Sequence, residues 1–363
     1  MILLILATGL FSWSEGNRVF IRQKYYEEKL AAARLMQQAE QIIKEYRLGQ
    51  GIYIDELNDP NRTALIGERY TLITTDRGSL NSKLTTLNPN FAAIMVDLFK
   101  KAGVKKGDVV AVNWTGSMPA LNIAVMSAAK VLGIELVIIS SVGASMFGAT
   151  DPDFTWLDME TLLYEKGVFS YKSMAASIGG GSDIGRGLSK TGRDLIIEAI
   201  KRNNVELVNE GSLEKNIQRK MELFKQNSKG EIKVYLNIGG GLSSLGSSFN
   251  ANLLKPGLNR IVSTKNIPMK GTLFLFAEEG IPIIHLLYIQ SIAEMYNIPI
   301  APVPLPEPGT GSLFIEEQYN LIVTAISFVI LIIAIAIVIF FDKSQERLKE
   351  REIISHSRVD NDD

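Results

Sequence analysis

The stretch Met174-Ala-Ala-Ser-Ile178 runs into Gly179-Gly180-Gly181, and the same arrangement returns where Val234-Tyr-Leu-Asn-Ile238 runs into Gly239-Gly240-Gly241. In each case an apolar segment of strand length ends in Ile, three glycines follow, and a serine-bearing segment comes next. Glycine lets the backbone approach a ligand closely and aim several N–H groups at one point. The two segments therefore predict an α/β sheet with anion-binding loops at the carboxyl ends of its strands.

The chain before the first glycine triplet has the alternation of a parallel sheet. The patterns predict a strand at Val109–Trp114, a helix at Pro119–Leu132 and a strand at Glu135–Ser140. Such a unit pairs its strands in parallel through a right-handed crossover. Further along, Thr272–Phe276 is predicted as a strand and Ile284–Tyr296 as a helix. We therefore expect a mostly parallel, doubly wound, Rossmann-like sheet.

Two apolar segments predict membrane attachment. Tyr319–Phe341 carries no charge and is long enough to span a bilayer, whereas Ile2–Trp13 is short for a span and is interpreted as a signal anchor. Lys343 and Arg347 follow the longer segment, which predicts a cytoplasmic tail and an extracytoplasmic main domain at the cell membrane. The basic residues after Ile2–Trp13 favour the opposite orientation, but the longer segment decides our expectation. Between them, Val19–Leu48 has the periodicity of an amphipathic helix.

The expected organisation follows these composition changes along the chain. The predicted parts are an N-terminal anchor (1–16), a juxtamembrane amphipathic helix (17–50), an α/β domain (51–308), a linker (309–318), a transmembrane helix (319–341) and a charged tail (342–363).

Composition excludes several classes of function. The 38 Lys and Arg residues nearly balance 39 Asp and Glu residues, so bulk charge argues against a nucleic-acid binder. The chain has no cysteine and 2 histidines, which excludes thiolate chemistry and multi-His or Cys-ligated metal centres. No metal site is predicted, and the sequence identifies no cofactor. Homo-oligomerisation stays open.

Four loops follow predicted strands and are expected to converge at one edge of the sheet. They are rich in Gly, Ser, Thr and Asn, which supply the N–H and hydroxyl groups that bind phosphates or carboxylates. The candidate ligand-binding residues are Asn113, Thr115, Gly116, Ser117, Gly179, Gly180, Gly181, Arg186, Gly239, Gly240, Gly241 and Ser243. Neither triplet has the spacing of a P-loop or of a dinucleotide fingerprint. Turns needed only for packing are the alternative.

Catalysis is a further hypothesis for the same edge. The candidates are His285, Ser117, Ser182 and Asp183, with His285 as general base beside a loop serine and an acid. The apolar neighbours of His285 favour a buried core histidine instead. Ser117 lies before Pro119, where the elbow motif of hydrolases needs a glycine, so a helix-start hydroxyl is the more frequent role. The sequence therefore leaves open whether the protein is an enzyme.

Several longer strings are similar to the poly-gamma-glutamate system proteins, a bacterial membrane-associated family. The resemblance lies in Gly107-Asp-Val-Val-Ala-Val-Asn-Trp-Thr-Gly-Ser-Met-Pro-Ala-Leu-Asn122, Ser140-Ser-Val-Gly-Ala-Ser-Met-Phe-Gly-Ala-Thr-Asp151, Ile178-Gly-Gly-Gly-Ser-Asp-Ile-Gly-Arg-Gly187 and Gly280-Ile-Pro-Ile-Ile-His-Leu-Leu287. It covers most of the chain from Lys83 to Pro308. The family brings no established catalytic residues to transfer.

The resemblance implies a process rather than a reaction. It predicts a membrane-anchored accessory protein of poly-gamma-glutamate synthesis or export, whose domain binds the polymer or the membrane subunits of its synthase. A hydrolase or transpeptidase of the polymer is the first alternative, and a structural scaffold of the synthase complex is the second. Tight binding of a polyanion favours several cations, and Arg186 is the main one in these loops.

Overall fold

The computed structural model describes residues 1–359, which form two compact units. Gln23–Phe314 is called the main unit here, and Met1–Arg22 together with the chain from Ile315 onward is called the terminal unit. The ends of the main unit meet, because Gln23 N–H donates to Phe314 C=O at 2.8 Å and Tyr26 packs edge-on against the Phe314 ring.

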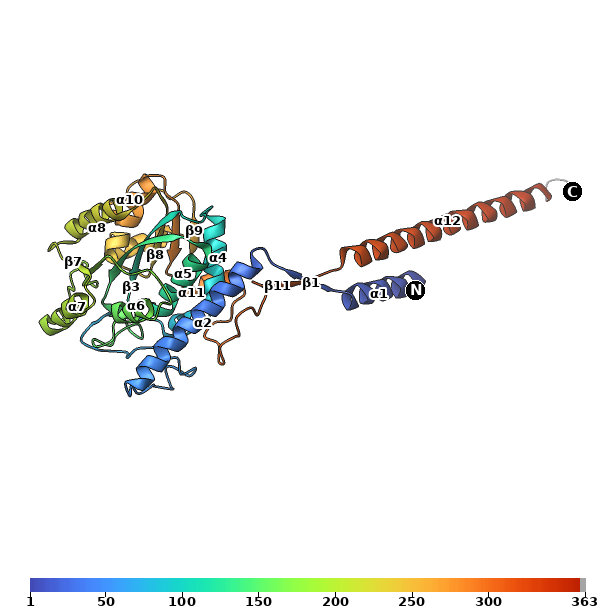
Figure 1. The fold of residues 1–363 in the computed structure, drawn as a ribbon. Coiled ribbons are helices and arrows are strands. Elements are labelled where there is room, and N and C mark those ends of the chain that lie inside the picture. Colours follow the sequence, from blue (N-terminus) through green and yellow to red (C-terminus); the bar gives the residue numbers. More distant parts are fainter. Residues whose placement is uncertain (360–363) are drawn as a thin grey trace. The chain divides into compact units, whose positions relative to one another are not determined.

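A seven-stranded sheet forms the centre of the main unit, with the order β7-β6-β4-β3-β8-β10-β9 (Figure 1). All of its pairs are parallel except that of β9 with β10. Along the chain, β4, β6 and β7 are added one after another on one side of β3. The next strand, β8, pairs with the other side of β3. The strands are β3 (Val109–Thr115), β4 (Glu135–Ser141), β6 (Ala175–Ser177), β7 (Glu206–Val208), β8 (Ile232–Ile238), β9 (Gly257–Asn259) and β10 (Ile283–Leu286).

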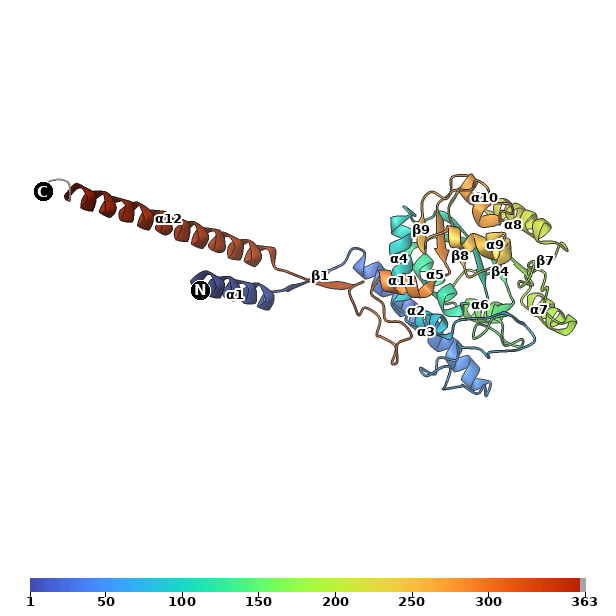
Figure 2. The same ribbon diagram turned by 180° about the vertical axis from the view of Figure 1, so that it is seen from behind.

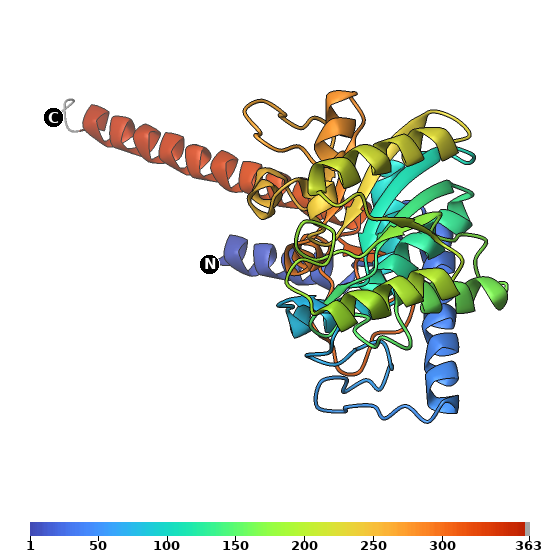
Figure 3. The same ribbon diagram turned by 90° about the vertical axis from the view of Figure 1, so that its left-hand side faces the viewer.

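Helices cover both faces of this sheet, as the opposite views of Figures 1 and 2 show. The larger core joins one face to α2 (Tyr26–Gly49), α3 (Leu80–Thr86), α4 (Phe91–Lys101), α5 (Pro119–Leu132), α6 (Trp156–Glu165), α7 (Lys190–Arg202) and α11 (Ile289–Met295). The smaller core joins the other face to α8 (Leu213–Asn227), α9 (Leu242–Leu245), the 3₁₀ turn η1 (Ser248–Leu253) and α10 (Thr272–Glu278). Figure 3 shows α2, in blue, along one side of the unit. A short parallel pair, β2 (Thr74–Asp76) and β5 (Ala144–Ser145), completes the unit.

Local chemistry explains the central β3–α5–β4 unit. All seven residues of β3 are buried, as expected for a parallel strand covered on both faces. Pro119 starts α5 at a position where no backbone donor is needed, and Gly133 ends it with a φ of 66°. Alternate β3 side chains enter the two cores, with Val110 in the larger and Ala111 in the smaller.

The terminal unit consists of α1 (Ile2–Gly16), β1 (Val19–Arg22), β11 (Ile315–Gln318) and α12 (Leu321–Val359), with β1 and β11 antiparallel. Within α12, Leu321–Arg351 is long and apolar enough to cross a membrane. The 15-residue α1 is too short for that and contacts α12, where the Ser14 and Ser327 hydroxyls are 3.3 Å apart. Arg18 binds Glu15 at 2.6 Å and lies over the Tyr319 ring at 4.7 Å.

Two elements near His285 are exchanged relative to the sequence prediction. Thr272–Phe276 lies in helix α10 rather than in a strand, and His285 lies in strand β10 rather than in a helix. Both segments are short and apolar, so periodicity does not distinguish a buried strand from a buried helix turn. Parallel pairing of Ile283–Leu286 with β8 decides the outcome. The helix predicted from Val19 begins at Tyr26, because residues 19–22 pair with β11 instead.

Candidate functional site

Polar side chains line one face of the sheet near the carboxyl ends of five strands. Asn113 of β3 is in register with Asn237 of β8, and Asn237 is in register with His285 of β10. On the other side of β3, Ser141 of β4 is in register with Ser177 of β6. All five residues are at most 1 % exposed and lie on the face of the smaller core. Asn113 and Asn237 flank the point where strand order reverses, which is where α/β sheets commonly bind ligands.

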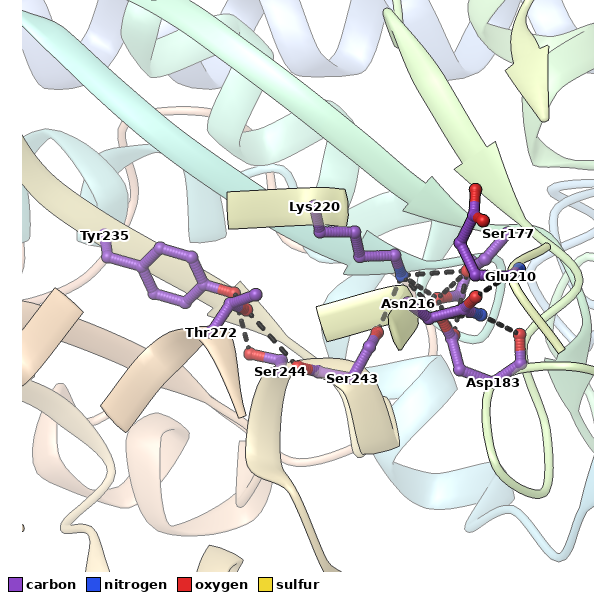
Figure 4. Close-up of polar contacts among 10 residues, drawn as sticks. Ser177, Asp183, Glu210, Asn216, Lys220, Tyr235, Ser243, Ser244 and Thr272 are labelled. Carbon is purple, nitrogen blue, oxygen red and sulfur yellow. Dashed lines mark hydrogen bonds and ion pairs between the residues drawn. The ribbon is translucent and has the colours of Figure 1, made fainter. Parts of the chain in front are cut away.

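A buried lysine reaches this face from α8. Figure 4 shows Lys220 extended toward the strand ends, where Nζ lies 2.8 Å from Asp183 Oδ2. Nζ also lies 2.8 Å from Ser177 Oγ and 2.6 Å from Ser243 Oγ. Asp183 Oδ1 in turn accepts from Ser141 and Ser177. These residues, Lys220, Asp183, Ser141, Ser177 and Ser243, are called the lysine cluster.

Two opposing influences act on the pKa of Lys220 in the lysine cluster. Burial lowers the pKa of Lys220, and the neighbouring Asp183 carboxylate acts in the other direction. Asn216 of α8 gives Asp183 a further donor, since its Nδ2 lies 3.3 Å from Oδ2. The carboxylate is therefore held by a cation, two hydroxyls and an amide.

The first glycine triplet serves to place Asp183. Gly179 and Gly180 have φ of 81° and 65°, and the left-handed backbone continues at Ser182 and Asp183, with φ of 55° and 60°. This turn brings Asp183 back beneath the loop, where it is 1 % exposed. Arg186, by contrast, is exposed. The loop therefore contributes an anion, the Asp183 carboxylate, whose donors Ser141, Ser177, Asn216 and Lys220 lie outside the loop.

The second glycine triplet covers Asn113. Gly239 has a φ of 85°, and a Cβ there would lie 2.7 Å from Thr115 Oγ1. Gly240 is exposed, and Gly241 is partly so. A Cβ at Gly241 would lie 3.6 Å from Asn113 Nδ2 and 4.0 Å from Ser141 Oγ. Gly241, which has no side chain, therefore lies between the protein surface and the buried side chains of Asn113 and Ser141.

Asn113, Asn237 and His285 carry four polar atoms that have no hydrogen-bond partner among residues 1–359: Asn113 Nδ2 and Oδ1, Asn237 Oδ1, and His285 Nε2. The three residues are called the polar triad. Each is fully buried. Burial also lowers the pKa of His285 to about 4, so this histidine is neutral at physiological pH. Buried polar groups without partners are costly, which makes the polar triad the strongest indication of a ligand site.

The remaining sequence candidates lie at the same edge but have structural partners. Ser117 Oγ accepts from Ser145 N–H at 2.9 Å, and Thr115 Oγ1 accepts from Ser117 N–H at 3.2 Å. Gly116 packs against the Val142 carbonyl, which a Cβ would approach to 2.5 Å. Lys83 donates to the Ser117 carbonyl and to Ser145 Oγ.

The structure does not assemble the serine–histidine–acid arrangement. His285 Nδ1 contacts the Asn237 amide, Asp183 pairs with Lys220, and Ser117 bonds to Ser145. Ser182 is half-buried in the first glycine loop. Ser243 contacts a lysine instead of a histidine, since its Oγ lies 2.6 Å from Lys220 Nζ, which also contacts Ser177. No cluster of three or more His, Asp or Glu side chains suited to a metal occurs in the described part of the chain.

Sequence reasoning missed Lys220, Asn237, Ser141 and Ser177. Lys220 had a detectable signal, because it falls between Ile217, Met221 and Phe224 on the apolar stripe of its helix. Asn237 interrupts an apolar strand just before a glycine triplet in the same way that Asn113 interrupts its own strand. A polar residue inside a buried pattern needs a partner, which is the signal that marks these positions.

The polar triad can bind a ligand through uncharged donors and acceptors beneath Gly241, and the buried amine of Lys220 can activate the Ser243 hydroxyl.

No family model matches the chain, and neither a curated protein nor a solved structure matches it.

Proposed function

We propose that this protein is a membrane-anchored accessory component of poly-gamma-glutamate synthesis or export. Its main unit is a doubly wound, Rossmann-like domain that binds the polymer, or a synthase subunit presenting it, on the outer side of the cell membrane. The choice of poly-gamma-glutamate as the polymer rests on the resemblance of the loop sequences to the poly-gamma-glutamate system proteins. The geometry supports a binding role at the carboxyl edge of the sheet.

The polar triad is the observation that carries this proposal. Three fully buried polar side chains stand on adjacent strands at the point where strand order reverses, and four of their atoms have no partner within residues 1–359. A packed core avoids such atoms, because each costs about 1–3 kcal/mol. A ligand that supplies their hydrogen bonds offsets this cost.

Membrane attachment in this proposal depends on α12. Its segment Leu321–Arg351 is long and apolar enough to cross a membrane. Lys343 and Arg347 follow the apolar part of this segment and favour a cytoplasmic tail. The main unit then lies outside, where an exported polymer is found.

The test uses two glycines in the same loop. In Gly241→Ala the new methyl group lies over Asn113, and its nearest contact, Thr115 Cγ2 at 3.4 Å, leaves the backbone unstrained. Gly240→Ala is the matched control, because its methyl group meets only Leu287 at 3.9 Å. We expect the detergent-solubilised full chain to bind poly-gamma-glutamate, Gly241→Ala to weaken binding at least tenfold, and Gly240→Ala to bind as the wild type does.

Equal binding by both variants would place the polymer elsewhere. If the wild-type chain fails to bind the polymer, the accessory role must involve a synthase subunit or a scaffold function instead. Thermal unfolding of both variants establishes that they are folded.

An enzyme is the second candidate, and the contact of 2.6 Å between Lys220 Nζ and Ser243 Oγ favours it. An unprotonated Lys220 takes the Ser243 proton while Oγ attacks an amide carbonyl, and it then protonates the leaving amine as an ester forms. Water releases the acyl group by hydrolysis, and a second amine releases it by transpeptidation. Shortening of the polymer by the wild type but not by Ser243→Ala would favour this candidate. The control is Ser182→Ala, in the other glycine loop.

A further inference from the structure

The unpartnered atoms of the polar triad have a definite donor and acceptor character. Asn237 Nδ2 donates to the Gly239 carbonyl at 2.9 Å, which identifies the nitrogen side of its amide and leaves Oδ1 as the unpartnered acceptor. The Asn113 amide adds one acceptor and one donor group.

The same network fixes the tautomer of His285. Asn237 Nδ2 lies 3.1 Å from His285 Nδ1, so Nδ1 accepts from the amide. In a neutral imidazole the proton is then on Nε2, which is the unpartnered nitrogen. His285 therefore presents a donor.

We propose that Asn113, Asn237 and His285 bind an amide group of the ligand rather than a carboxylate. An amide has both characters that these atoms need: a carbonyl oxygen that accepts from an unpartnered donor of the polar triad, and an N–H that donates to an unpartnered acceptor. An ionised carboxylate supplies acceptors alone and leaves both asparagine oxygens facing negative charge. This inference rests on the proposed function and specifies which part of a gamma-glutamyl chain is recognised.

The nearby charges agree with a neutral ligand group. Lys220, the cation of the lysine cluster, is 0 % exposed and already contacts Asp183 and two serine hydroxyls. The Lys220–Asp183 pair is neutral as a whole and does not attract a carboxylate. Neighbouring parallel strands are about 4.8 Å apart, so the polar triad spans roughly 10 Å, about the size of one amide with its flanking methylenes.

Two polymers distinguish the amide from the carboxylate. Poly-gamma-glutamate carries carboxylates and backbone amides, whereas polyacrylate of matched length carries carboxylates alone. We expect the detergent-solubilised full chain to bind poly-gamma-glutamate and polyacrylate to compete at least tenfold more weakly. Equal competition by polyacrylate would overturn the amide assignment while leaving polymer binding intact.

Side-chain variants test whether the polar triad causes the preference for poly-gamma-glutamate over polyacrylate. Asn113→Ala removes one donor and one acceptor, and we expect it to lose about tenfold in affinity for poly-gamma-glutamate, the equivalent of one hydrogen bond. It should also lose the preference over polyacrylate. Asn203→Ala is the control, since Asn203 is also buried but bonds to Asp158 and the Ala199 carbonyl. Unchanged preference in Asn113→Ala would contradict the proposal.

Failure of the proposed function is separable from failure of this inference. If the full chain binds neither polymer, small probes replace them: gamma-glutamylglutamate, which has an amide, and glutarate, which has only carboxylates. Thermal stabilisation of the wild type by the dipeptide alone, lost in Asn113→Ala, supports amide binding even without polymer binding. Stabilisation by both probes or by neither overturns it.

Discussion

The ammonium group of Lys220 lies 2.8 Å from Asp183 Oδ2, and the two side chains are 0 % and 1 % exposed. This contact joins helix α8 to the loop of the first glycine triplet, which lies between β6 and α7. Two serine hydroxyls complete the hydrogen bonds of Lys220. The ion pair therefore fixes the loop that borders the candidate ligand site.

Replacing Lys220 by Met should destabilise the main unit by about 3–5 kcal/mol, because Asp183 is left as a buried carboxylate without its cation. The double variant Lys220→Met/Asp183→Asn should recover much of the loss. Denaturant unfolding of the full chain in detergent, followed by tryptophan fluorescence, measures both. Equal stabilities of the single and double variants would show that Asp183 has other adequate partners.

Glu160 should make stability fall as pH rises through the acidic range. It accepts from Ser173 N–H at 2.7 Å, and burial raises its pKa to about 7 from an ordinary 4.5. The folded chain holds this proton more tightly than the unfolded chain, so its contribution is full below pH 4.5 and lost by pH 7, about 3 kcal/mol in all. Glu160→Gln should remove that slope.

The comparison of wild type with Glu160→Gln isolates this group, since His285 acts in the opposite direction over the same range. Burial lowers the pKa of His285, so its contribution is lost as pH falls. Unfolding free energies at pH 5 and pH 7.5 suffice. Parallel profiles for the two proteins would contradict the role of Glu160.

Lys83 should make the free energy of unfolding rise with pH above neutrality. Burial lowers its pKa to about 7 from 10.5, and its Nζ donates to Ser145 Oγ at 2.9 Å. Between these values the unfolded chain holds a proton that the folded chain lacks, so stability rises with pH, by about 2–3 kcal/mol from pH 7 to pH 9. Lys83→Met should lack this rise in denaturant unfolding, whereas Lys229→Met, at an exposed position, should retain it.

The absence of cysteine offers a direct measure of membrane orientation. Single cysteines at Lys229, exposed in the main unit, and at Ser344, exposed in α12, report on the two sides. We expect a membrane-impermeant maleimide to label Lys229→Cys in intact cells and Ser344→Cys only after lysis. The reverse pattern would place the main unit in the cytoplasm.

The predictable parts of the fold are those with local signals. Pro119 and Gly133 bracket α5, and the apolar run Val109–Val112 marks β3, so this unit follows from the sequence. The exchange of strand and helix around His285 was not predictable, because pairing with β8 decides it and the segment itself carries no period. Asp183 was a candidate, but its partner Lys220 comes from a helix far along the chain. Such contacts depend on the tertiary arrangement rather than on local pattern.

Because Gln23 and Phe314 are adjacent, the main unit can be inserted as a whole into another protein chain. Because its first and last backbone groups are hydrogen-bonded neighbours, the unit has the end-to-end spacing of an ordinary surface loop. A host protein can receive it between two residues of a hairpin without stretching either partner. Conversely, a short glycine linker across these ends, with new termini opened at an exposed turn such as Lys229–Gly230, gives a circular permutant for use without the terminal helices.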